Sequence, residues 1–228
     1  MGKKIIITGA TGMIGSLILE HCLNSREVSQ VMSLVRRESG IVDEKLHEVI
    51  VRDFLNLNKH ESHFDSIDVV YYCLGTYTES VDQELFRETT VDYPEMLART
   101  LIKKNPDLTF CLLSGYGADR TEQSWITFNK HKGVIENRLS SMGFKSFYTF
   151  RPGYIYPVIK RQEPNFAYVI MRYLYMMTKP FCGKIAIKSN ELAQVMFQVG
   201  INGCNAEILE NKDIVKLYKS GLNSSIFK

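Results

Sequence analysis

Residues 8–15 read Thr8-Gly9-Ala10-Thr11-Gly12-Met13-Ile14-Gly15 and directly follow the apolar run Ile5-Ile6-Ile7. This run and the apolar spacing after Gly15 predict a strand, a glycine-rich turn and a helix in succession. In such a turn, Gly9 permits a sharp bend, Gly12 lets a pyrophosphate approach the backbone, and Gly15 lets the helix sit close to the sheet. The pattern therefore predicts a dinucleotide-binding loop with phosphates at the helix N-terminus. An ordinary glycine-containing loop is the alternative.

Short apolar runs recur along the chain with helical segments between them. They lie at residues 5–7, 31–35, 49–51, 69–74, 110–113 and 147–150. This alternation predicts an α/β fold, a doubly wound parallel sheet with helices on both faces. Helices are predicted near residues 13–24, 83–104 and 126–142, and Pro94 is expected to kink the second or to divide it in two.

After residue 153 this regular alternation weakens. We expect a tyrosine- and methionine-rich helix near residues 166–177, a strand at 184–188, a helix from Glu191 and a last strand–helix pair near 207–217. The helix at 166–177 is interpreted as packed on the core, with a substrate pocket as the alternative. We therefore predict one domain over residues 1–228, with segments 154–228 forming a small C-terminal lobe that caps the site.

Composition narrows the class of protein. The chain has 228 residues, a formal net charge of +3 and five cysteines. Its charges are interspersed, so no basic face predicts nucleic-acid binding. The widely spaced cysteines are typical of reduced thiols in a cytosolic protein, not of disulfides or a metal site. No apolar stretch has the length of a signal peptide core or a membrane span. We predict a cytoplasmic protein with a small-molecule substrate or effector and no metal; a homo-oligomer is left open.

The end of the second predicted strand bears on the choice of cofactor. An NAD-preferring site usually carries Asp or Glu there, whereas this chain has Arg36 and Arg37. A guanidinium can bind a 2′-phosphate through two hydrogen bonds and can stack on adenine, so the pair predicts NADP(H), with NAD(H) as the second choice. A solvated basic loop is the alternative. After the third strand, Asp53, followed by Phe54, is placed either to bind the adenine amino group or to cap a helix.

The end of the fourth predicted strand supplies small residues to the same edge. Cys73-Leu74-Gly75-Thr76 follows the apolar run, and we expect Cys73, Leu74 and Gly75 to lie along the ribose–phosphate part of the cofactor. Gly75 is the strongest candidate of the three. Its alternative role is to let the chain turn at the strand end.

The motifs TGATGMIG, LVRR, RDF, YCLGT, LLSGYGAD, FNKHKGVIE and FRPG follow one another along the chain. In this order they resemble the short-chain dehydrogenase/reductase superfamily, in particular its atypical branch with the HIV-1 Tat-interacting oxidoreductase-like and NAD-dependent epimerase-like proteins. The late run at residues 207–212 resembles the same branch. The resemblance implies a Rossmann fold, an NAD(P) cofactor and hydride transfer to or from a carbonyl or hydroxyl group.

The resemblance also implies roles for individual residues. Ser114 matches the superfamily serine that holds a substrate carbonyl. Lys132 matches the lysine of a Tyr-x-x-x-Lys pair, where it lowers the phenol pKa and binds the nicotinamide ribose. Pro152 and Gly153 match a turn whose backbone meets the nicotinamide carboxamide. The tyrosine position, however, holds Phe128.

Phe128 limits the functional conclusion. A phenyl ring exchanges no proton, and loss of a positioned general acid costs about 10²–10⁴-fold in rate. Three hypotheses follow: a catalytically silent NADP(H)-binding sensor or scaffold protein, a substitute acid, or a reaction that needs none. Tyr116 is the candidate substitute, and His131 is expected to point about 100° away from Lys132 on the helix. Tyr154 and Tyr156 are further candidates without the required spacing.

Overall fold

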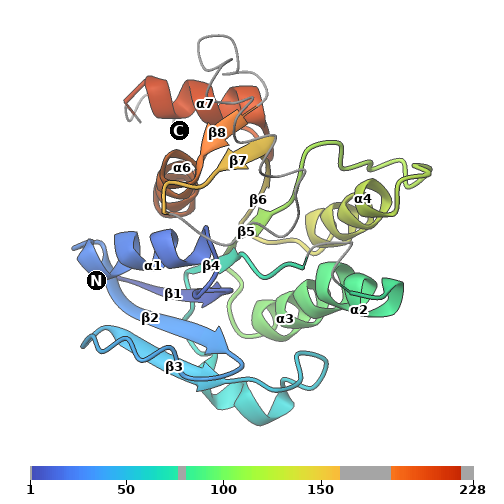
Figure 1. The fold of residues 1–228 in the computed structure, drawn as a ribbon. Helices are drawn as coiled ribbons and strands as arrows, with labels where there is room; N and C mark the ends of the chain where they lie inside the picture. Colours follow the sequence, from blue (N-terminus) through green and yellow to red (C-terminus); the bar gives the residue numbers. More distant parts are fainter. Residues whose placement is uncertain (1, 77–80, 160–185, 222–228) are drawn as a thin grey trace.

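The central sheet has seven parallel strands in the order β3-β2-β1-β4-β5-β6-β9 (Figure 1). The structure is a computed structural model that describes residues 2–76, 81–159 and 186–221. The order reverses between β1 and β4, which confirms the predicted doubly wound parallel sheet. The strands are β1 (Lys3–Thr8), β2 (Val28–Val35), β3 (Leu46–Ile50), β4 (Val69–Tyr72), β5 (Thr109–Leu113), β6 (Ser146–Arg151) and β9 (Ile208–Glu210).

Helices cover both faces of this sheet. One face packs against α1 (Gly15–Asn24), α6 (Ser189–Asn202) and α7 (Asn211–Lys219), and the other against α3 (Tyr93–Ile102) and α4 (Thr127–Ser140). Because neighbouring strand residues point to opposite faces, Ile5 and Ile7 belong to the first core and Ile6 to the second. A 3₁₀-helix, η1 (Asn58–His63), precedes β4.

The predicted helix at residues 83–104 changes its type along its length. It consists of α2 (Gln83–Arg87), the π-helical turn η2 (Glu88–Asp92) and α3. Pro94 lies in the first turn of α3, directly after the π-helical turn η2, and it has no N–H to donate to that preceding turn. The predicted segment is thus interrupted by a change of helix type, the π-helical turn η2 immediately before α3, and not by a gap in the helix.

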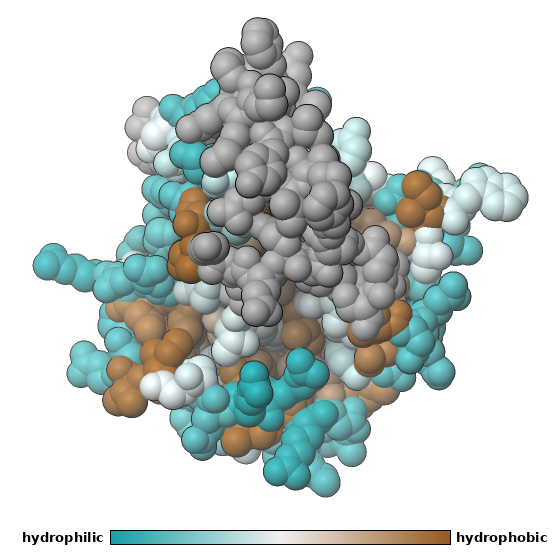
Figure 2. All heavy atoms as spheres, viewed as in Figure 1, coloured by the Kyte–Doolittle hydropathy of each residue, from teal (hydrophilic) through white to brown (hydrophobic). Residues whose placement is uncertain are grey.

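The strands after β6 contribute to two sheets. A two-stranded parallel sheet joins β7 (Tyr154–Tyr156) to β8 (Ala186–Lys188), and β9 extends the main sheet beside β6. The predicted helix at 166–177 lies outside the described residues. Among the residues described, no helix combines the length and the apolar character that crossing a membrane requires. Hydrophilic and hydrophobic side chains are interspersed over the face seen in Figure 2.

Candidate cofactor and substrate site

The loop between β1 and α1 is shaped by backbone contacts that only glycine allows. Gly9 has a φ of +71°, in the left-handed region. A Cβ atom on Gly15 would lie 2.2 Å from the Gly9 carbonyl oxygen, and the Gly12 N–H donates to that oxygen at 2.8 Å. Gly9 therefore makes the sharp bend and Gly15 allows the close approach of α1, as the sequence predicts. A pyrophosphate at Gly12 stays a prediction.

Some predicted loop residues serve the fold with their side chains. Thr8 is buried, and its hydroxyl accepts hydrogen bonds from the backbone N–H groups of Cys73 and Leu74 at 3.2 and 3.3 Å. Ile14 is buried in the core. Thr11 is exposed, and Met13 lines a cavity at the end of the sheet. Thr8 thus fixes the ends of β1 and β4 beside each other at the point where the strand order reverses.

Charged groups lie around one tyrosine beyond the ends of β2 and β3. The pKa of Tyr93 is raised by burial and by Glu88, and the charges of Asp53 and Arg36 also act on it. Arg36 and Arg37 are exposed, and neither forms an ion pair with any residue that the structure describes. Arg36 and Asp53, distant in sequence, therefore come within electrostatic reach of one hydroxyl.

Asp53 and Phe54 have defined local roles. The Asp53 carboxylate accepts a hydrogen bond from the Leu55 N–H at 2.9 Å and closes a turn rather than capping a helix. Phe54 is buried and stacks on Tyr93 with ring centroids 5.5 Å apart. The alternatives for Asp53 are therefore a turn, which is present, and the adenine contact, which stays a prediction.

A cavity of about 490 Å³ lies at the carboxyl ends of the central strands. It brings together Met13 of the glycine loop, the residues after the ends of β4, β5 and β6, and two residues of α4, Phe128 and Lys132. Arg36, Arg37, Asp53 and Phe54 are not among its lining residues. The predicted site residues that line it are Met13, Cys73, Leu74, Gly75, Ser114, Tyr116, Phe128, Lys132, Pro152, Gly153 and Tyr154.

The β4 side of the cavity has open space beside Gly75 and an unreactive thiol at Cys73. A Cβ atom on Gly75 would meet nothing within 4 Å, so packing does not require glycine at this position. Burial raises the pKa of the Cys73 thiol to about 12, opposed by the charge of Lys132. A thiol with this pKa stays protonated at neutral pH and is no nucleophile.

Lys132 brings a buried amine to the opposite wall. Its Nζ donates to the Leu113 carbonyl oxygen at 3.2 Å and lies 5.8 Å from the centroid of the Phe128 ring, one helical turn away. Burial lowers the pKa of Lys132 to about 8, although Glu136 acts in the opposite direction. Phe128 lies against Gly115, where an added Cβ atom would come within 2.5 Å of the ring.

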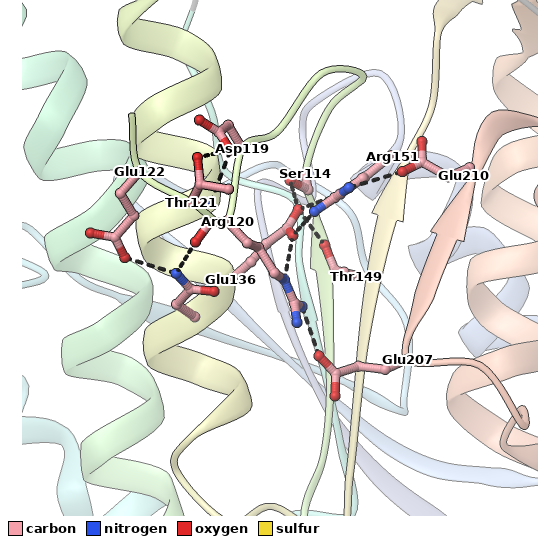
Figure 3. Close-up of polar contacts among 11 residues, drawn as sticks. Ser114, Asp119, Arg120, Thr121, Glu122, Glu136, Thr149, Arg151, Glu207 and Glu210 are labelled. Carbon is pink, nitrogen blue, oxygen red and sulfur yellow. Dashed lines mark hydrogen bonds and ion pairs between the residues drawn. The ribbon is translucent and has the colours of Figure 1, made fainter. Parts of the chain in front are cut away.

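The hydroxyl of Ser114 is bound to a buried carboxylate (Figure 3). Its Oγ donates to Oε1 of Glu136 at 2.6 Å, and the same oxygen accepts from Thr149 Oγ1 and Arg151 Nε at 3.0 Å each. Arg120 donates to Oε2 at 3.0 Å, and Arg151 donates there as well. The pKa of Glu136 is lowered by these hydrogen bonds and charges, although its burial acts to raise it. Glu136 is therefore an ionised carboxylate with both oxygens occupied.

The same two arginines reach the C-terminal part of the chain. Arg151 Nη1 donates to Glu210 at 2.9 Å, and Arg120 Nη2 donates to Glu207 at 2.7 Å. We define the Glu136 network as these residues: Ser114, Glu136, Thr149, Arg151, Arg120, Glu207 and Glu210 (Figure 3). The sequence alone predicts Ser114 as a site residue but not the network. Glu136 and Arg151 lie in the motifs FNKHKGVIE and FRPG, but sequence spacing alone does not pair them.

The turn after β6 is held from two sides. The Tyr116 N–H donates to the Pro152 carbonyl oxygen, and the Gly153 N–H donates to Oδ1 of the buried Asn211, both at 3.0 Å. The sequence does not predict this role for Asn211, which lies at the start of α7. The Tyr116 side chain is 71% exposed at the edge of the cavity. His131 stacks on Phe86 at 5.8 Å and does not line the cavity, which agrees with its predicted direction.

Comparisons with known proteins give a consistent family and fold. Residues 5–130 match the NAD dependent epimerase/dehydratase family. Protein HTATIP2 of Rattus norvegicus is 26% identical over 221 residues, which cover 95% of this chain and 90% of that protein. The mitochondrial protein fmp52 of Aspergillus niger is 25% identical over 218 residues, covering 90% of each. The Bordetella bronchiseptica enzyme WbmF, solved in complex with NAD⁺, is 13% identical with a TM-score of 0.67, and the match covers 100% of this chain and 81% of WbmF.

Within the described ranges, no three histidine, cysteine or acidic side chains are grouped so that they could hold a metal ion. Besides backbone groups, the polar side chains that line the cavity include the Ser114 hydroxyl, the Lys132 amine and the phenols of Tyr116 and Tyr154.

Proposed function

This chain belongs to the NAD dependent epimerase/dehydratase family, and we propose that it binds NADP(H) and acts on a small molecule with a carbonyl or hydroxyl group. One observation carries the proposal: Met13 of the glycine loop lines the same cavity as Ser114 and Lys132, beside the reversal of strand order. Ligands of doubly wound sheets bind at this position.

The residues present fit a dinucleotide. The glycine loop places backbone N–H groups at the start of α1, and the space beside Gly75 leaves room for a ligand backbone to approach. Lys132 would hold the nicotinamide ribose, and the backbone of Pro152 and Gly153 would meet the carboxamide. When bound, the cofactor supplies a hydride donor or acceptor.

Arg36 and Arg37 support the choice of NADP(H). They are exposed and have no ion pair among the described residues, so their guanidinium groups are available to a 2′-phosphate. Titration calorimetry with NADPH and NADH tests this choice, and we expect NADPH to bind about 10- to 100-fold more tightly. The double variant Arg36→Ala with Arg37→Ala should remove the difference, whereas Arg26→Ala, at the other end of β2, should retain it. Equal affinities in the wild type would exclude the preference.

Phe128 favours a second candidate function, a catalytically silent NADP(H)-binding sensor or scaffold. The Phe128→Tyr variant separates the two functions. If the remaining residues are arranged for hydride transfer, the new phenol beside Lys132 should raise NADPH-dependent reduction of a carbonyl panel by about 10²–10⁴-fold. Tight NADPH binding without any gain in turnover would support the sensor. Turnover in the wild type that Tyr116→Phe abolishes would instead identify Tyr116 as the substitute acid.

We also propose that residues 154–228 cap this site within a single domain. The proposal is supported by β7, whose Tyr154 and Ile155 line the cavity. The predicted cytoplasmic location is tested by cell fractionation, since the Aspergillus niger relative is named as mitochondrial. Sedimentation of the purified chain tests the predicted option of a homo-oligomer.

A further inference from the structure

A separate cavity of about 280 Å³ lies at the edge of the sheet opposite the candidate site. This amino-end cavity is formed by the amino ends of β1, β2 and β3 and by the segment that runs from η1 to β4. Among the described residues, none lines both this cavity and the one at the carboxyl ends of the strands. The residues that line it are Lys4, Ile5, Gln30, Met32, His47, Ser62, His63, Asp65 and Ile67.

The register of the sheet explains why polar groups meet in the amino-end cavity. Lys4 pairs with Gln30, and Met32, two positions further along β2, pairs with His47. Paired side chains of adjacent strands point to the same face, so all four lie on the face that Met32 packs into the second core. η1 ends across this face and places His63 against His47, with ring centroids 5.6 Å apart. Two imidazoles distant in sequence therefore meet beside a lysine.

Most of the polar side chains of this cavity lack a protein partner. The carboxylate that lines it, Asp65, pairs with Lys104 at 3.0 Å. Asp68 accepts a hydrogen bond at 2.8 Å from the backbone N–H of Lys4, not from its ammonium. Five side chains of the cavity form no hydrogen bond and no ion pair with any residue that the structure describes: Lys4, Gln30, His47, Ser62 and His63.

These five side chains supply more hydrogen-bond donors than acceptors. An ammonium has three donors, and an imidazole donates from one nitrogen when neutral and from both when protonated. A phosphate group matches such a set, because it combines negative charge with three or more acceptor oxygens. The volume of about 280 Å³ lies near the lower limit of ligand pockets, roughly 300 Å³, and fits a small molecule.

We propose that the amino-end cavity binds the phosphate group of a small anion, with Lys4, His47 and His63 as its main donors. The apolar side chains of Met32 and Ile67 line the same cavity and face the remainder of the ligand. This site is separate from the proposed cofactor site and does not depend on it.

Binding at this site should strengthen as the pH falls. Imidazole gains a proton between about pH 8 and 5, and two protonated rings 5.6 Å apart repel each other unless an anion lies beside them. The other charged groups at the cavity are Lys4 and Asp65, with Lys104 paired to Asp65 and Asp68 beside β1. Lysine and aspartate ordinarily keep their charge in this interval, so the change comes from the two imidazoles.

NMR signals of the His47 and His63 rings report on this site directly. Sulfate is the first probe, because it is tetrahedral and keeps both charges from about pH 5 to 8, the interval in which imidazole titrates. When sulfate replaces chloride at constant ionic strength, both rings should shift in a saturable way. The affinity should be about tenfold higher at about pH 6 than at about pH 8.

Variants locate the binding. Lys4→Met and His47→Gln should each weaken sulfate about tenfold, and thermal unfolding shows whether they are folded. Lys59→Met is the matched control, because Lys59 is an exposed lysine of η1 that does not line the cavity. The double variant Arg36→Ala with Arg37→Ala should also bind sulfate at the two histidines unchanged.

Inorganic phosphate and phenyl phosphate then separate two sources of the phosphate group. Tighter binding of phenyl phosphate indicates a small phosphomonoester, and equal binding indicates free phosphate; either result supports a phosphate site. The proposal is overturned if neither ring responds to sulfate, if binding is the same at both pH values, or if Lys4→Met and His47→Gln both bind as the wild type does.

Discussion

The two ends of the candidate site are built by different means. The end around the β1–α1 loop depends on the absence of side chains. Gly9 adopts a positive φ, and the Gly9 carbonyl oxygen lies so close to Gly15 that a Cβ atom on Gly15 would overlap it. The opposite end, between β5, α4 and β6, depends on added charge. There Glu136 is buried between Arg120 and Arg151.

Because the two ends are built differently, substitutions at them should change the stability of the protein by different amounts. A backbone contact at the glycine loop is local, because Gly9 and Gly15 are six positions apart in sequence. The Glu136 network joins segments that are distant in the chain, and removal of one member leaves other buried charges uncompensated. The substitutions below test whether the two ends differ in this way.

The largest effect is expected for Arg151→Met. This change removes the hydrogen bonds of Arg151 to Glu136 and Glu210 and leaves the buried Glu136 with Arg120 as its remaining arginine. Breaking a buried ion pair from one side costs about 3–5 kcal/mol of stability. Urea denaturation measures the loss.

Arg99→Met is the matched control. Arg99 pairs with Glu95 on the surface, with 61% of the arginine side chain exposed, and such pairs contribute less than about 1 kcal/mol. Similar losses for Arg151→Met and Arg99→Met would show that the Glu136 network does not stabilise the fold more than a surface pair does.

Lys132→Met is expected to stabilise the protein. Burial lowers the pKa of Lys132 to about 8 from 10.5, so folding at neutral pH places a charge where it is disfavoured. Removing that charge should raise the free energy of unfolding by up to about 3 kcal/mol at pH 7. Cofactor affinity should fall in the same variant, which would indicate that the lysine is retained for binding rather than for stability.

The pH dependence of stability checks the same residue. Between about pH 8 and 10.5 the unfolded chain holds a proton on Lys132 that the folded chain has released. The free energy of unfolding should therefore rise with pH in this interval, relative to Lys132→Met. The exposed Lys130→Met variant should follow the wild type. A wild-type curve parallel to that of Lys132→Met would contradict the lowered pKa.

A smaller effect is expected at the glycine end. Gly15→Ala places a Cβ atom 2.2 Å from the Gly9 carbonyl oxygen, and relief of this overlap should cost about 1–3 kcal/mol. Gly75→Ala is the control, because a Cβ atom there meets nothing within 4 Å; its stability should stay within about 0.5 kcal/mol of the wild type. Thermal melts compare the two, and equal stability of both variants would exclude the steric role of Gly15.

Sequence reasoning succeeds where a local pattern has one physical solution. The alternation of apolar runs and helices predicts the parallel sheet, and the glycine spacing predicts the β1–α1 loop. Pro94 predicts the interruption of the helix after residue 83, because proline is tolerated in the first turn of a helix and not in its interior.

The remainder of the site depends on contacts that no local pattern contains. The resemblance predicts a ligand carbonyl at Ser114, which stays a prediction, but it does not indicate that the Ser114 hydroxyl donates to Glu136, 22 positions away. Asn211 supports Gly153 from 58 positions away. Such pairs follow from how strands and helices meet in space, which spacing along one chain does not determine.

Two glutamates of the Glu136 network, Glu207 and Glu210, are synthesised late, so the network forms after the β1–α1 loop has been made. Synthesis proceeds from the N-terminus, at roughly 5–20 residues per second, so the glycine loop and its strands leave the ribosome long before β9 does. Arg151 and Arg120 acquire Glu210 and Glu207 only after these last residues have emerged. During translation, therefore, a nascent chain can contain the complete β1–α1 loop while the Glu136 network still lacks two of its charges.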